Sequence, residues 1–313
     1  MMTLGFDTSN YTTSIAAFDG QSGKNCSRLL EVKPGQLGLR QSDALFSHVK
    51  QLPELAEALF SQYPQEKVTA IGVSSRPRAV EGSYMPCFLA GVSQASVLAQ
   101  ALQVPLYQFS HQQGHICASL WSAGRMELLN MPHLAWHLSG GTTELLLVEP
   151  ENGLPHATKI GGTSDISAGQ LIDRTGQMLG CRFPAGKELD RLSQESDSAD
   201  YFRVKVSDSV FSFSGVQNKL LEYYNKTNDP AATAGYCLRS VIHAVEKATK
   251  QALVDYPGYS VVFSGGVASN AMLRAHAPAK DSVFCPPEFS TDNAMGIAVL
   301  TWLQGGAVWN EPS

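Results

Sequence analysis

The chain has 313 residues, which is long enough for two lobes that each bury a core. Apolar residues make up 43% and charged residues 16%, as in an ordinary globular protein rather than a disordered or fibrous one. The 23 basic and 28 acidic residues give a net charge of -5, which argues against a dedicated nucleic-acid coat but leaves room for a local basic patch.

Export and membrane insertion are both disfavoured. Met1 leads directly into a strand-like run, without a basic and apolar leader, so we expect no secretory signal. No apolar run approaches the roughly 20 residues that span a bilayer. The six cysteines are scattered and form no C-x-x-C pair, which indicates reduced thiols rather than a disulfide framework or a thiolate cluster. We therefore expect a cytoplasmic protein.

The first elements in chain order are two strands joined by a polar turn. Residues 2–9 begin as a strand and end in Asp7, Thr8 and Ser9, and residues 10–19 continue as the second strand of a hairpin. The turn offers a carboxylate, hydroxyls and backbone N–H groups, which can bind a phosphate or a phosphate-bound cation. A hydrated turn explains it equally well. Its candidate catalytic residues are Asp7, Ser9 and Asn10.

Alternating helices and strands come next and lead to a histidine pair. We expect helices over 44–63 and 88–102 and strands over 68–74 and 104–108. A further helix then begins at His111-Gln112-Gln113-Gly114-His115. Positions i and i+4 share one helical face, so both imidazoles can point at one Zn²⁺, Fe or Ni ion. Alone, the spacing is explained more simply by two partly exposed histidines.

A second hairpin carries two glycines in its turn. A strand over 134–138 runs into Ser139-Gly140-Gly141-Thr142, and a strand over 144–148 leaves it. This is not a Walker loop, because it lacks the G-K-[ST] ending and a following helix. The glycines let a ligand approach the backbone closely. The hairpin echoes the first one, which predicts two related lobes.

The remaining elements place polar groups at the ends of helices and strands. We expect helices over 166–180, with Asp173 midway, and over 187–193, 216–224 and 231–256. A strand over 260–263 leads into Gly265, Gly266 and Asn270 at a helix start, where a nucleotide can bind, although G-x-G-x-x-G is absent. We expect Ser290 to cap the last helix and Asp292 to lie in its first turn, where the helix dipole favours a carboxylate.

Seven motifs follow one another along the whole chain: D-T-S-N-Y-T-T-S, H-Q-Q-G-H, L-S-G-G-T-T-E-L, A-G-Q-L-I-D-R, F-S-F-S-G, S-G-G-V-A-S-N and S-T-D-N. In order and spacing the chain resembles the tRNA threonylcarbamoyladenosine synthase family, long known as O-sialoglycoprotein endopeptidases or glycoproteases. The resemblance implies an α/β, actin-like ATPase (ASKHA) fold, with two RNase H-like lobes and mixed sheets around a nucleotide and metal cleft. We expect lobes over 1–107 and 108–293, with a C-terminal helix at about 294–313 packing back on the first lobe.

The resemblance also implies the ligands and the reaction. One Fe or Zn ion is expected on His111, His115 and Asp292. A threonylcarbamoyl group is expected to move from an acyl-adenylate to the adenosine beside the anticodon of tRNA, with an adenine nucleotide (ATP, AMP or the acyl-adenylate) and Mg²⁺ as ligands. The residues implied in nucleotide or substrate binding are Leu138, Ser139, Gly140, Gly141, Thr142, Asp173, Gly186, Gly265, Gly266 and Asn270. The expected protein partners are a second copy or family subunits, docked through long helices.

The chain departs from the family pattern near these residues. Family members read H-x-E-G-H and S-G-G-H-T, where this chain has Gln113 and Thr142, and their first hairpin is acidic where this one has Tyr11 and Thr12. The sequence therefore predicts a divergent paralogue. Its alternative function is a nucleotide-binding regulatory or scaffold protein without tRNA modification, or carbamoylation of another acceptor. A protease is disfavoured because H-E-x-x-H is absent.

Overall fold

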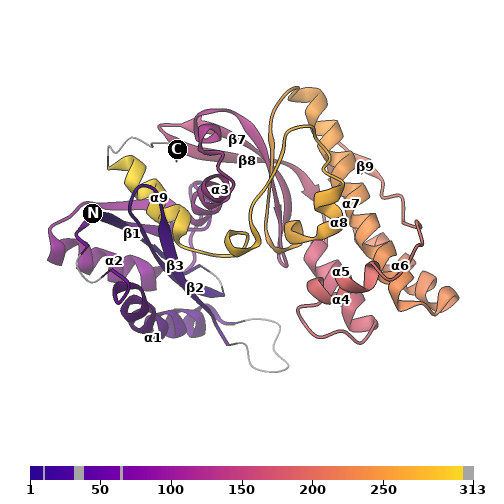
Figure 1. Ribbon diagram of the computed structural model, residues 1–313, viewed down its shortest axis with the longest axis horizontal. Helices are drawn as coiled ribbons and strands as arrows, with labels where there is room; N and C mark the ends of the chain where they lie inside the picture. The colour runs from indigo at the N-terminus through magenta and orange to yellow at the C-terminus, as the bar shows by residue number, and fades with distance from the viewer. Residues whose placement is uncertain (10, 32–38, 64–65, 306–313) are drawn as a thin grey trace. The chain divides into compact units, whose positions relative to one another are not determined.

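The computed structural model describes residues 1–9, 11–31, 39–63 and 66–305, in two compact units (Figure 1). Unit 1 comprises Met1–Met131, Glu149–Ala157 and Asp292–Ser313, of which the last stretch is described to residue 305. Unit 2 comprises Pro132–Val148 and Thr158–Thr291. The lobe boundary expected after residue 107 stays a prediction.

Unit 1 is built on a mixed sheet in the order β3-β2-β1-β4-β5. Its strands are β1 (Met2–Asp7), β2 (Thr12–Phe18), β3 (Gly23–Leu29), β4 (Val68–Arg76) and β5 (Leu106–Ser110). β1, β2 and β3 pair antiparallel, whereas β1, β4 and β5 run parallel, with Gly5 opposite both Ala16 and Gly72. The hairpin and the two parallel strands were predicted. β3 was not, because its polar, largely exposed residues lack an apolar alternation.

Helices cover both faces of this sheet (Figure 1). α1 (Gln41–Phe60) and α2 (Phe88–Leu102) enclose a core with Leu4 and Phe6 of β1. Successive side chains of a strand point to opposite faces, so Gly5 faces the other way. There α9 (Met295–Gln304) lies against β1, and α3 (His111–Ser122) packs beside α9. The C-terminal helix thus belongs to the core of the N-terminal sheet.

Unit 2 repeats this strand order inside a larger sheet, β12-β11-β6-β7-β8-β10-β9. Its strands are β6 (His133–Leu138), β7 (Thr143–Glu151), β8 (Leu154–Thr163), β9 (Val206–Ser207), β10 (Val210–Phe211), β11 (Val261–Ser264) and β12 (Ser282–Phe284). β6 pairs antiparallel with β7 and parallel with β11, as β1 does with β2 and β4. The order β8-β7-β6-β11-β12 therefore matches β3-β2-β1-β4-β5, which confirms the two related α/β lobes predicted from the hairpins.

The helices of unit 2 pack on its sheet around one long helix. They are α4 (Ala168–Met178), α5 (Gly186–Ser193), α6 (Ser214–Thr227), α7 (Pro230–Asp255) and the short α8 (Ala271–Ala275). The Asp229 side chain accepts from the Ala232 N–H and Pro230 begins α7, a favourable helix start. The buried Trp136 of β6 donates its indole N–H to Thr249 of α7 at 2.8 Å. Within the described ranges, no helix is long and apolar enough to cross a membrane.

The prediction for the start of the last helix is wrong. α9 begins at Met295, so Ser290 is not its cap and Asp292 does not lie in its first turn. The Ser290 hydroxyl donates instead to the carbonyls of Cys285 and Pro286, which fixes the turn η3 (Pro287–Phe289). The Asn293 side chain accepts from the Met295 N–H at 3.0 Å. Asp292 therefore lies in the connection before the helix.

Candidate functional site

The histidine pair and Asp292 lie together inside unit 1. His115 Nε2 is 3.0 Å and His111 Nε2 is 3.5 Å from Oδ1 of Asp292, and the two imidazole rings are 4.3 Å apart. One ligand atom from each of the three residues lies within 4.8 Å of the others. Two imidazole nitrogens and a carboxylate oxygen are donors that Zn²⁺ and Fe²⁺ accept, and three protein ligands leave coordination positions for water or substrate. The group could therefore hold a metal ion.

Asp7, predicted as catalytic, is buried and contacts His111. Its buried carboxylate accepts from Nδ1 of His111 at 2.8 Å, which leaves Nε2 facing Asp292. Burial opposes the charge of His111, but the carboxylates of Asp7 and Asp292 outweigh it and raise the pKa of His111 to about 10. The same contacts lower the pKa of both carboxyls against the effect of their burial. Positive charge is favoured at this place, as a bound cation requires.

Ser9 faces the same ligand atoms. Its hydroxyl is 3.5 Å from Nε2 of His111, and its N–H donates to the Asp7 carboxylate at 2.9 Å. The turn after β1 is thus folded back on the carboxylate that orients His111. Asn10, the third predicted catalytic residue of this turn, lies outside the described residues.

Gln113, which replaces a glutamate of the family pattern, caps α3. Ser110 Oγ accepts from the Gln113 N–H, and the Gln113 side-chain oxygen accepts from the Ser110 N–H at 2.9 Å. This reciprocal capping box satisfies two backbone donors of the first turn, and glutamine fills the position as well as glutamate does. The exchange therefore preserves the start of the helix that carries both histidines.

Two glycines set the distance between α3 and the segment with Asp292. A Cβ atom added to Gly296 would lie 1.8 Å from the carbonyl oxygen of Gly114, and one on Gly114 would lie 2.8 Å from the Ile297 side chain. The backbones of α3 and α9 therefore touch directly. This contact brings together ligands that are 177 residues apart in the chain. Spacing alone did not reveal it, because it depends on two glycines in different helices.

The second predicted group lies in unit 2, around the β6–β7 turn. The Ser139 N–H donates to the Thr142 carbonyl at 2.8 Å, and the Thr142 N–H donates to Ser139 Oγ at 3.0 Å, which closes a two-residue turn of Gly140 and Gly141. The start of α4 lies against this turn, because Ser167 Oγ donates to the Gly140 carbonyl at 2.6 Å. Leu138, before the turn, is fully buried and serves the core.

The glycines of this region fall into two kinds. Gly265 has a φ of +90°, and a Cβ atom there would lie 2.2 Å from the carbonyl oxygen of Leu138, so its backbone packs on the end of β6. A Cβ atom on Gly140, Gly141, Gly186 or Gly266 would meet nothing within 4 Å. Open space above four glycines is what a ligand needs to lie against the backbone.

Two carboxylates connect the remaining predicted residues. Asp173 of α4 accepts from the Ala185 N–H at 2.8 Å, beside Gly186 at the start of α5, and burial raises its pKa. One turn along α5, Asp190 accepts from the Asn270 side-chain N–H at 2.8 Å and from the Ala271 N–H at 3.2 Å. The sequence analysis missed Asp190. Its signal was the spacing from Gly186, which places it one helical turn away.

A further missed carboxylate holds the F-S-F-S-G motif. Asp165 accepts from the Phe213 N–H at 2.8 Å, from the Ser214 N–H at 3.1 Å and from the Ser212 hydroxyl. Burial opposes these bonds, but together they hold the pKa of Asp165 well below its usual range. The motif is therefore fixed to the loop before α4 and shapes the start of α6.

Comparison with solved structures defines the class of fold. The chain aligns with HypF from T. kodakarensis at a TM-score of 0.64 and 12% identity, over 97% of this chain and 48% of that one, so it spans about half of HypF. It aligns with a ROK hexokinase from Thermus thermophilus at a TM-score of 0.56 and 14% identity, over 98% and 99% of the two chains. These are proteins of the actin-like ATPase class, and the chain has the predicted ASKHA fold.

The family follows from sequence comparison. The family model described as TsaD, tRNA N6-adenosine threonylcarbamoyltransferase, matches residues 35–299. The protein of that name from Streptococcus pneumoniae (strain Taiwan19F-14) is 31% identical, over 94% of this chain and 90% of its own length. The one from Thermosipho africanus (strain TCF52B) is 30% identical, over 96% and 93%. The chain belongs to this family, as its seven motifs predicted.

Proposed function

We propose that the chain transfers a threonylcarbamoyl group from threonylcarbamoyl-adenylate to the adenosine beside the anticodon of tRNA. The N6 amino nitrogen attacks the carbamoyl carbonyl carbon and forms the new N–C bond. The bond from this carbon to the phosphate oxygen breaks, AMP leaves with the electron pair, and the amino group loses one proton. The family name and the 30% identical relatives support the acceptor and the group that is transferred.

The observation that carries the proposal is the open glycine surface in unit 2. Space above Gly140, Gly141, Gly186 and Gly266 suits a flat or anionic ligand against backbone N–H groups. Asp173 beside Gly186 and Asn270 beside Gly266 supply directed polar groups for ribose hydroxyls or base edges. A nucleotide bound in this way presents AMP as a leaving group that is already anchored.

The donor set in unit 1 fits a divalent metal. We assign His111 Nε2, His115 Nε2 and Asp292 Oδ1 as its ligands. When bound, Fe or Zn supplies Lewis-acid stabilisation of developing negative charge. Asp7 fixes the tautomer and orientation of His111 through Nδ1. We therefore assign Asp7 as a positioning residue and Ser9 as a polar neighbour of the ion, with a hydroxyl for a bound water or substrate oxygen.

Substitutions in the open glycine surface test the nucleotide site. Gly186→Leu places a side chain where the protein leaves space, at the start of α5, without requiring a positive φ. Gly215→Leu is the matched control, because Gly215 is also open and lies at the start of α6. Calorimetry should show that Gly186→Leu loses AMP binding and the control keeps it. Wild-type AMP affinity in Gly186→Leu would show that the nucleotide does not bind over Gly186.

The reaction is tested with chemically supplied threonylcarbamoyl-adenylate and a tRNA transcript that carries an adenosine beside its anticodon. Nuclease digestion and mass spectrometry should detect threonylcarbamoyladenosine, and Gly186→Leu should reduce its yield at least tenfold. Tight AMP binding with no modified nucleoside would instead support the regulatory or scaffold alternative. The capping role of Gln113 favours the enzyme, since that departure from the family pattern leaves the histidine helix intact.

A further inference from the structure

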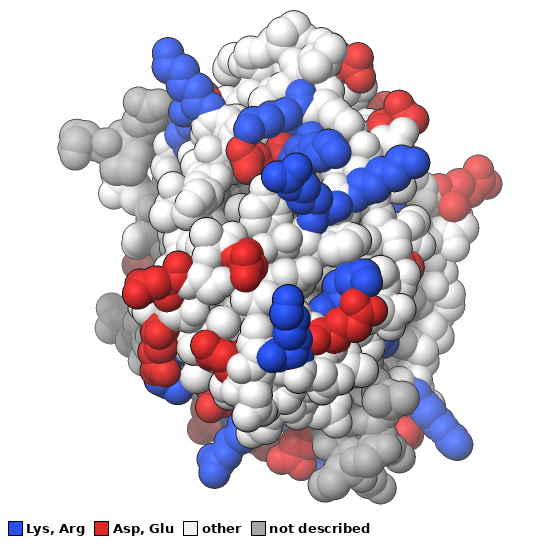
Figure 2. Space-filling model, turned by 90° about the vertical axis from the view of Figure 1, so that its right-hand side faces the viewer, with Lys and Arg blue, Asp and Glu red and all other residues white. Residues whose placement is uncertain are grey.

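Basic side chains gather on one surface of unit 2 although the chain as a whole is acidic. Figure 2 shows Lys and Arg side chains close together over the upper half of the face it presents, with a few acidic groups beside them. Arg203, Lys247 and Lys250 all act electrostatically on His243, which places the three cations around one histidine. With the exposed Lys205, they form what we call the α7 basic strip.

The strip is made of a helix face and an extended segment that runs along it. His243, Lys247 and Lys250 stand at i, i+4 and i+7 of α7 and so share one face. Beside them, Arg203 and Lys205 alternate with the buried Val204 and Val206, so both basic side chains point outward. The segment and the helix therefore contribute cations to the same surface.

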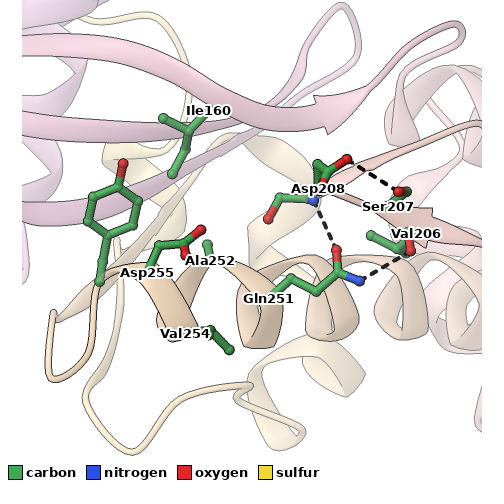
Figure 3. Close-up of a pocket in the computed structure, with 10 residues that line it drawn as sticks. Ile160, Val206, Ser207, Asp208, Gln251, Ala252, Val254 and Asp255 are labelled. Carbon is green, nitrogen blue, oxygen red and sulfur yellow. Dashed lines mark hydrogen bonds between the residues drawn. The ribbon is translucent and has the colours of Figure 1, made fainter.

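Side-chain hydrogen bonds hold the segment on the helix at both ends. The Phe202 N–H donates to Ser240 Oγ at 2.9 Å. At the other end the Gln251 side chain accepts from the Ser209 N–H at 2.9 Å and donates to the Val206 carbonyl at 3.2 Å (Figure 3). Ser240 and Gln251 are about 16 Å apart at the ~1.5 Å rise of a helix. The four cations are thus arranged along a line of fixed length.

The charge balance of the strip is positive. Glu246, which pairs with Lys250, is the acidic group acting on His243, against the three cations. Burial and then those cations lower the pKa of His243, so the positive charge of the strip comes from its arginine and lysines. The strip ends at a cavity of about 610 Å³ next to Gln251 (Figure 3). The carboxylates of Asp208 and Asp255 line this cavity, so the surface charge there is negative.

We propose that the α7 basic strip binds the phosphate backbone of the RNA substrate, through Arg203, Lys205, Lys247 and Lys250. This inference rests on the proposed function. A line of about 16 Å covers several phosphates at the ~3.4 Å axial spacing of a nucleic-acid strand. Tyr201, whose ring is 5.1 Å from that of His243, adds a partly exposed aromatic surface for a base or ribose. A surface that binds an anionic membrane inserts several apolar side chains among its cations. Beside Lys250 on α7 the exposed apolar side chain is Val254, so an RNA strand matches this combination better.

The test is direct binding of an unmodified tRNA transcript to the full chain, by fluorescence anisotropy at several salt concentrations. The variant R203Q/K247Q/K250Q removes three charges from the strip. The control K24Q/K67Q/K226Q removes three charges from exposed lysines elsewhere. The variant R203K/K247R/K250R keeps the charge and should restore binding. Of the six substituted positions, Lys250 has a salt bridge and the other five have none among the described residues, so folded stability, checked by thermal melting, should stay equal.

Each phosphate contact contributes a slope of about 0.7–0.9 to the plot of log affinity against log salt, or about four- to fivefold in affinity near 0.15 M salt. The strip variant should therefore bind about 50- to 100-fold more weakly and lose about 2–3 from the slope. In turnover it should raise the KM for tRNA and leave both kcat and the KM for the adenylate unchanged.

Three results would overturn the proposal. The first is equal tRNA affinity in R203Q/K247Q/K250Q and the wild type. The second is an equal loss of tRNA affinity in the control K24Q/K67Q/K226Q. The third is that the wild-type protein binds phosphatidylserine vesicles but not tRNA. If RNA binds through the strip but no modified nucleoside forms, the strip proposal holds and the proposed function is refuted. Failure of the strip proposal can therefore be distinguished from failure of the proposed function.

Discussion

The contact between Gly114 and Gly296 predicts that one added methyl group weakens metal binding at least a hundredfold. A Cβ atom on Gly296 would lie 1.8 Å from the Gly114 carbonyl oxygen, whereas real contacts of this kind essentially never fall below 3.0 Å. In Gly296→Ala the two backbones must therefore separate by about 1.2 Å, the difference between those two values. A metal site tolerates errors in ligand distance of only about 0.2 Å. The displacement is several times that tolerance.

The measurement is metal content and affinity. Wild type and Gly296→Ala are purified in parallel, loaded with Zn²⁺, and analysed by inductively coupled plasma mass spectrometry and by titration against a chromogenic chelator. We expect one bound ion per wild-type chain and at least a hundredfold weaker affinity in the variant. Overpacking should also lower the free energy of unfolding by about 1–3 kcal/mol.

A control at the end of the same helix separates loss of the metal from general damage to α9. A Cβ atom on Gly305 would make contacts of 3.4 and 3.5 Å, which are ordinary, so Gly305→Ala should bind metal as the wild type does. If Gly296→Ala keeps one ion per chain at wild-type affinity, the direct approach of α3 and α9 does not set the ligand geometry, and the reasoning is refuted.

Three further outcomes follow from the polar and thiol groups. Asp7→Asn should weaken Zn²⁺ binding about 10- to 100-fold in the same chelator titration, because the carboxylate that orients the His111 imidazole loses its charge. An unchanged Zn²⁺ affinity would contradict this role. Burial raises the pKa of Asp173, so its ionisation destabilises the folded state as pH rises from the unfolded value of about 3.9. Denaturant unfolding should therefore show that Asp173→Asn removes this loss of stability between pH 4 and 7, while calorimetry shows weaker AMP binding. Cys117 and Cys237 are buried, and burial raises the pKa of both thiols, that of Cys237 to about 12, whereas Cys181 is partly exposed. Maleimide at pH 7.5 should therefore label Cys181 in the folded chain. It should label Cys117 and Cys237 only after unfolding, as read by peptide mass spectrometry.

The sequence was sufficient where local periodicity and motif order determine the structure. The N-terminal hairpin, the helix at His111 and the Gly140-Gly141 turn were all predicted, because alternation, helical spacing and glycine pairs are local signals. The likeness of the two hairpins predicted two related lobes, and the sheet topology shows that relation as a repeated strand order.

What the sequence could not supply depends on contacts between distant residues. Asp292 was expected inside a helix because Ser290 resembles a cap, but the Ser290 hydroxyl finds better acceptors in the carbonyls of Cys285 and Pro286. Asp190 and Asp165 were missed because their donors come from residues 80 and 48 positions away. The resemblance implied only residues expected to bind ligands, whereas these carboxylates hold the protein's own loops.

The position of α9 has a consequence for synthesis on the ribosome. Gly5 and Gly72 in the first sheet are covered by α9, which leaves the ribosome only after all of unit 2 has been made. Until then the nascent N-terminal sheet has one bare face and two imidazoles without their carboxylate. Maturation of unit 1 is therefore post-translational in part, and a prematurely terminated chain lacking residues after 291 would be a substrate for chaperones and proteases rather than a metal-loaded half-protein.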